Sequence, residues 1–61
     1  MKNILQKSIN TLSGRQRDYE SALQEADSPM LRLLYADSAS VIGDCIEVIS
    51  GTAREYGVPI A

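Results

Sequence analysis

The sequence lacks the features that usually hold a very small domain together. Its 61 residues include one cysteine and no histidine, which excludes an intrachain disulfide and the histidine-containing zinc patterns. Tryptophan and phenylalanine are absent, and only three tyrosines supply aromatic rings. The core of so short a chain rarely contributes more than about 3–5 kcal/mol. Association with other chains is therefore the expected source of further stability.

Charge and hydropathy disfavour several classes of protein. Six basic residues stand against eight acidic ones, and this balance does not favour binding to nucleic acid. No apolar run reaches the roughly 18 residues of a transmembrane helix. Polar residues at 6–8 interrupt the start of the chain, so it lacks the apolar core of a signal peptide. A lone cysteine fits a reducing compartment, and we expect a cytoplasmic protein with no membrane partner.

Two helix boundaries can be read from proline and glycine. Pro29 disfavours helical geometry at Ser28 and suits the first position of a new helix, with Ser28 as its N-cap. Gly57 suits the left-handed position after a helix, and Pro59 stops any continuation. The sequence predicts an all-α fold with helices over about 3–26 and 29–56 and a short apolar tail over 58–61. With so short a connection, the helices form one antiparallel hairpin domain over 1–61.

The first predicted helix carries a narrow stripe at heptad spacing. Its members are Leu5, Ile9, Leu12, Gln16, Tyr19, Leu23 and Ala26. Ser13 and Gln16 also fit a capping box, which would break and restart the helix there. We predict one continuous helix instead, because the stripe keeps its phase across Gly14 and Gly14 falls on the opposite face.

The second predicted helix is apolar over a much wider arc. Tyr35, Ile42, Ile49 and Tyr56 recur every seven residues, and the rows beside them are Ala39, Ile46, Ala53; Ser38, Cys45, Thr52; and Leu34, Val41, Val48. One narrow partner helix cannot cover so wide an arc, so the hairpin is predicted to assemble into a homo-oligomeric helical bundle, with a dimer favoured. The predicted interface between chains is Tyr35, Val41, Ile42, Cys45, Ile46, Val48, Ile49 and Tyr56.

The basic first quarter of the chain contains the candidate ligand residues. Lys7, Arg15 and Arg17 lie in the stretch over 1–17 that has no acidic residue, and Tyr19 follows them. Arginines bind phosphate or carboxylate oxygens, and a tyrosine can stack on a base. A small anion or nucleotide is therefore a candidate ligand. Cys45 has no basic neighbour within a helical turn, so we interpret it as a packing residue and predict no catalytic residue, metal site or cofactor.

Three functional classes follow from these patterns. The favoured one is a small non-enzymatic homo-oligomeric interaction protein, an adaptor, regulator or inhibitor of another protein. The alternative is an oligomer that holds a small anion or nucleotide in pockets between subunits. A second alternative is an RNA- or DNA-binding helical bundle that uses the basic start of each first helix.

Overall fold

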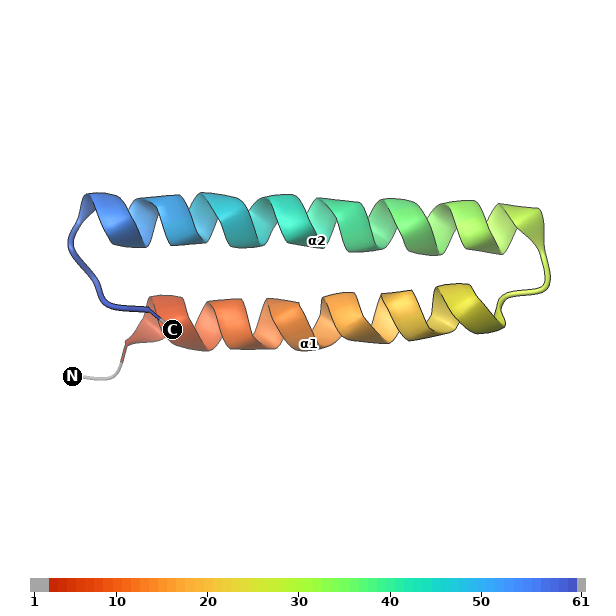
Figure 1. Cartoon of the computed structure of the whole chain (residues 1–61), viewed down its shortest axis with the longest axis horizontal. Coiled ribbons are helices and arrows are strands. Elements are labelled where there is room, and N and C mark those ends of the chain that lie inside the picture. Colours follow the sequence, from red (N-terminus) through yellow and green to blue (C-terminus); the bar gives the residue numbers. More distant parts are fainter. Residues whose placement is uncertain (1–2, 61) are drawn as a thin grey trace.

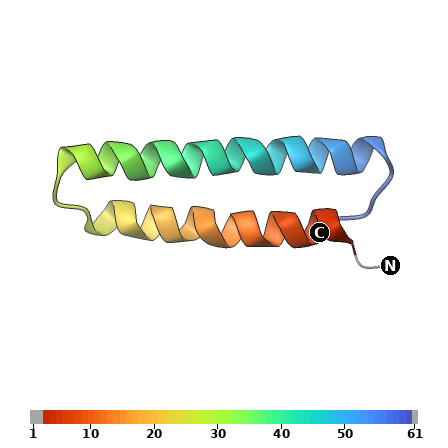
Figure 2. The ribbon, with the colours of Figure 1, turned by 180° about the vertical axis from the view of Figure 1, so that it is seen from behind.

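Two antiparallel helices lie side by side in the computed structural model, which describes residues 3–60 (Figures 1 and 2). Helix α1 spans Ile4–Glu25 and helix α2 spans Pro29–Glu55. The predicted all-α hairpin is confirmed, and each boundary agrees with the prediction to within one residue. The connection over 26–28 is a tight turn that reverses the chain direction and places the two helices antiparallel.

The turn between the helices is fixed by the backbone at Ser28 and Pro29 and by the side chain of Arg32. Pro29 occupies the start of α2, and Ser28 is the N-cap residue in an extended conformation. The Ser28 side chain makes no capping hydrogen bond, so its predicted capping role falls to its carbonyl, which accepts from the Arg32 amide at 3.0 Å. Arg32 Nε also donates to the Ala26 carbonyl at 3.1 Å. The first turn of α2 is thereby tied to the end of α1.

The opposite end of the hairpin is closed by the tail. Gly57 has a φ of 69°, the left-handed conformation predicted for it. The Val58 amide donates to the Ala53 carbonyl at 2.8 Å and the Gly57 amide to the Arg54 carbonyl at 3.2 Å, the paired bonds of a Schellman motif. This motif turns the tail back toward the start of α1 (Figure 1).

Asn3 joins that tail to α1. Its Oδ1 accepts from the Gln6 amide at 3.1 Å and caps α1, while its Nδ2 donates to the Pro59 carbonyl. One side chain therefore serves the helix with its acceptor and the tail with its donor.

Helix α1 runs unbroken through Gly14, as the stripe predicts. Every member of that stripe is buried or half-buried, whereas Gly14 is exposed and has open space around the position of a Cβ atom. The alternative of a break at Ser13 is wrong for this structure.

Gln16 is the polar member of the stripe and has a defined role between the helices. Its Nε2 donates to the Ala39 carbonyl of α2 at 3.1 Å. The same nitrogen would lie 2.8 Å from a Cβ atom on Gly43, a distance that real contacts do not reach. The missing side chain of Gly43 is therefore what lets the Gln16 amide reach the α2 backbone.

The interior of the hairpin is thin. The buried apolar residues among those described are Ile9, Ala26, Ala39 and Ala53. The molecule measures 44 × 17 × 12 Å, with a radius of gyration of 13.8 Å. A compact globule of this length would have a radius of gyration of about 10.5 Å. The hairpin is a rod with one layer of side chains between its helices.

The contact at Gly43 gives a testable difference between two glycines. Gly14→Ala should raise the free energy of unfolding by about 0.5–1 kcal/mol, because alanine favours a helix and the site is open. Gly43→Ala should give no such gain, since its Cβ displaces the Gln16 amide and costs a hydrogen bond worth about 1 kcal/mol. Urea unfolding at one protein concentration measures both. In a Gln16→Ala background the two substitutions should become equal, and equal gains without that change would contradict the contact.

The two roles of Asn3 can be separated by substitution. Asn3→Ala should lower the free energy of unfolding by about 1 kcal/mol, the usual contribution of a helix N-cap. Asn3→Asp keeps an acceptor at the helix N-terminus, where negative charge is favoured, but its carboxylate has no hydrogen for the Pro59 carbonyl. We expect the Asp variant to keep the unfolding free energy better than the Ala variant, and both to release the tail to carboxypeptidase. A tail equally protected in all three proteins would rule out the Asn3–Pro59 link.

Candidate interaction surface

Helix α2 presents two apolar stripes rather than one broad arc. The inner stripe packs against α1 and is half-buried or buried along its length. Its members are Tyr35, Ala39, Ile42, Ile46, Ile49 and Ala53. The outer stripe is displaced from it by one residue, or about 100° around the helix. Its members are Leu31, Leu34, Ser38, Val41, Cys45, Val48 and Thr52, alternately three and four residues apart.

The outer stripe is a heptad seam with no helix against it. Leu34, Val41 and Val48 are 56%, 60% and 69% exposed, although each has the spacing of a residue in a helix–helix interface. Leu31 is 42% exposed, and the Cys45 side chain is exposed as well. Apolar side chains repeated at this spacing are typical of a surface that another helix covers.

The polar members of the outer stripe are compatible with such a cover. The Thr52 hydroxyl donates to the Val48 carbonyl of its own helix at 3.0 Å, so it needs no hydrogen-bond partner from another chain. An almost wholly apolar groove of about 360 Å³ runs between Val41, Cys45, Val48 and Ile49, with Asp44 at its edge. The groove is shallow and continues the line of the stripe.

Cys45 does not pack in the interior of the hairpin, and its predicted place in an interface between chains stays a prediction. Its side chain is exposed because it belongs to the outer stripe, which faces away from α1. The structure divides the predicted interface residues between the two stripes. Tyr35, Ile42, Ile46 and Ile49 are half-buried on the inner one, while Val41, Cys45 and Val48 are exposed on the outer one. Tyr56 lies beyond both, 76% exposed.

Sequence reasoning missed Leu31, although a signal for it was present. The alternating spacing of three and four extends from Ser38 back through Leu34 to Leu31. Met30 and Leu33, 74% and 60% exposed, were also missed. They lie on the polar side of α2 and follow no repeat that marks them.

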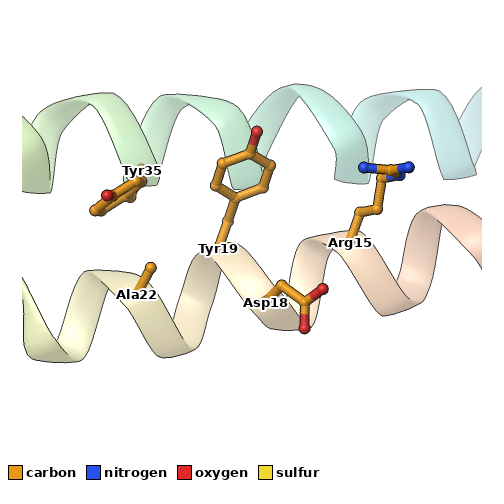
Figure 3. Close-up of a pocket in the computed structure, with 5 residues that line it drawn as sticks. All are labelled: Arg15, Asp18, Tyr19, Ala22 and Tyr35. Atoms are coloured by element: carbon orange, nitrogen blue, oxygen red, sulfur yellow. The ribbon is translucent and has the colours of Figure 1, made fainter.

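A second hollow lies beside the stripe and contains two of the four candidate ligand residues. It is an open pocket of about 260 Å³ lined by Arg15, Asp18, Tyr19, Ala22 and Tyr35 (Figure 3). The rings of Tyr19 and Tyr35 are tilted, with centroids 6.1 Å apart. Arg15 and Tyr19 are thus brought together, as a ligand site would require. Asp18 at the same pocket offsets the charge of Arg15.

The other two candidate ligand residues lie elsewhere. Arg17 is two residues from Arg15, about 200° around the helix, and does not line the pocket. Lys7 is exposed two turns away. The four residues predicted from the sequence therefore do not converge on one site, because a straight helix separates them.

Comparisons with protein-family models, with curated proteins and with solved structures found no match to this chain. Neither helix, over the part of the chain that the structure describes, is long and apolar enough to cross a membrane. The surface of α2 and the tyrosine pocket are accordingly interpreted from their own geometry.

The tyrosine pocket yields a prediction about ligands. We expect no heat above dilution when the protein is titrated with a panel of nucleoside mono-, di- and triphosphates in a calorimeter. Asp18 lines the pocket together with Arg15, and no second basic residue among residues 3–60 lines it. Binding that Arg15→Gln abolishes and Arg17→Gln retains would instead establish the pocket as an anion site. Arg17→Gln is the matched control, since it removes the same charge from the same helix.

Proposed function

We propose that this chain is a small non-enzymatic interaction protein that associates with itself and acts on another protein as an adaptor, regulator or inhibitor. The observation that carries the proposal is the outer stripe of α2. A hairpin that had no partner would gain nothing from a second heptad seam, and exposed polar residues at those positions would serve its solubility better.

Energetics support the same conclusion. Fully burying one Val, Leu or Ile side chain contributes about 1.5–3 kcal/mol. Leu31, Leu34, Val41 and Val48 are four such side chains, all more than two-fifths exposed. Their burial against another chain is comparable with the roughly 3–5 kcal/mol expected from the whole core of a domain this small. Folding and association are therefore expected to be linked.

The tyrosine pocket carries the second candidate function, a small-anion or nucleotide binder. It is supported by one arginine beside two aromatic rings. The outer stripe is the stronger support, because it involves four large side chains over several turns of α2, whereas the charge at the pocket is balanced by Asp18.

Charged substitutions on two faces of α2 test the proposal. Val41→Glu and Val48→Glu should lower the mass measured by sedimentation equilibrium to that of one chain and lower the helical signal at micromolar concentration, because a charge is then buried at the interface. Ser40→Glu, on the exposed polar face of the same helix, should change neither. The unmodified protein should melt at a temperature that rises with its concentration. A well-folded monomer at about 100 µM, with the melting temperature independent of concentration, would overturn the proposal.

A further inference from the structure

The surface area of the hairpin indicates how much of it a partner should cover. The chain exposes 4777 Å². A compact monomer of 6.7 kDa exposes about 3,900 Å², so the hairpin carries an excess of about 900 Å². A standard protein interface buries about 800 Å² from each partner. The excess is thus the size of one interface, which fits a dimer.

The outer stripe fits a second copy of itself when the two helices run antiparallel. In that arrangement, a two-fold axis that passes between Ala39 and Ser40 places residues of the outer stripe opposite residues of the same stripe in the second copy. Leu31 then lies opposite Val48 of the second copy, Leu34 opposite Cys45, and Ser38 opposite Val41. Each layer sets a smaller side chain against a larger one, so the layers fill evenly.

Charged residues on the neighbouring face of α1 are also complementary when two copies are related by an antiparallel two-fold axis. Tyr19 lines both the tyrosine pocket and a groove formed with Asp37, Ser38 and Val41. Arg15 and Asp18, which line the same pocket as Tyr19 (Figure 3), therefore lie on the side of the hairpin that carries the outer stripe. If the two α1 helices run antiparallel and the axis passes between Gln16 and Arg17, Arg15 of each copy lies opposite Asp18 of the other. The axis therefore gives two equivalent pairs of opposite charge. A parallel match would set arginine beside arginine and aspartate beside aspartate.

The two matching points lie at one level of the rod. The Gln16 amide donates to the Ala39 carbonyl at 3.1 Å, which places the midpoint of the α1 match beside the midpoint of the α2 match. A single two-fold axis therefore satisfies both the apolar layers of α2 and the charges of α1. This coincidence is independent of the surface-area argument.

We propose that two copies of this chain form an antiparallel four-helix bundle about a two-fold axis at the level of Gln16 and Ala39. Helix α2 packs on α2 through the outer stripe, and Arg15 pairs with Asp18 across the axis. The proposal rests on the self-association proposed above and specifies its geometry. At the exposed rim, Asp37 lies near Asp44 of the second copy, and salt screens that repulsion.

Disulfide trapping with the native Cys45 tests the register. Leu34→Cys should give a covalent dimer under oxidised glutathione, with peptide mapping showing a link between positions 34 and 45. Leu33→Cys, one residue away and exposed on the polar side, is the matched control and should stay uncrosslinked. The unmodified protein should also stay uncrosslinked, because its two Cys45 residues lie about 16 Å apart along the axis, beyond disulfide reach.

A charge exchange tests the axis without cysteine. Arg15→Glu and Asp18→Arg should each weaken the dimer several-fold at low salt, and the double variant should restore it. An oligomer that forms no 34–45 disulfide, or that links Cys45 to Cys45, would overturn this register while leaving self-association intact. A folded monomeric protein would overturn both. Restored affinity in the double variant together with the 34–45 disulfide would establish the proposed bundle.

Discussion

The structure depends on the single layer of side chains between two helices. A helix in a larger domain has several neighbours, but here each helix has one, so its interior is limited to what that one seam can hold. Among the buried apolar residues described, three are alanines and one is an isoleucine. The larger apolar side chains of α2 therefore remain at the margins of the seam or outside it. The apolar surface of this molecule is a direct consequence of its having only two layers.

The single layer of side chains also explains why hydrogen bonds, rather than apolar contacts, fix the alignment of the two helices. A single layer of apolar side chains brings the helices together without fixing their positions along the rod, since apolar contacts are non-directional. Directional bonds supply that information at three levels. At the turn, the Arg32 side chain donates a hydrogen bond to the Ala26 carbonyl. At the middle of the rod, Gln16 donates to the Ala39 carbonyl, and at the open end Asn3 donates to the Pro59 carbonyl. Each donor is a side chain and each acceptor a backbone carbonyl.

Local chemistry made most of the fold predictable from the sequence. Pro29 and Gly57 restrict their own backbone, so they gave the helix ends without knowledge of the rest of the chain. The α1 stripe was predictable because it repeats. The long-range contacts were not predictable, because no pattern links Asn3 to Pro59, or Gln16 to Gly43, across the sequence.

The candidate surface was predictable only in part. The width of the α2 arc showed that one helix would not cover it, but not where the boundary between covered and uncovered residues would fall. That boundary depends on how α1 is rotated against α2, and the spacing of apolar residues along one helix does not specify that rotation. The separation of Arg15 from Arg17 was predictable, because residues two apart on a helix point in nearly opposite directions.

The notch at Gly43 has a consequence for how the chain finds its alignment during folding. Sliding α1 by seven residues along α2 would keep apolar side chains in contact with apolar side chains, so hydrophobic pairing discriminates poorly against such misaligned hairpins. Seven residues to either side of Gly43 stand Ala36 and Ser50, and both carry a Cβ atom where the Gln16 amide would need space. Misaligned states thus leave the half-buried Gln16 amide without its bond, and the missing side chain of Gly43 distinguishes the native alignment from them.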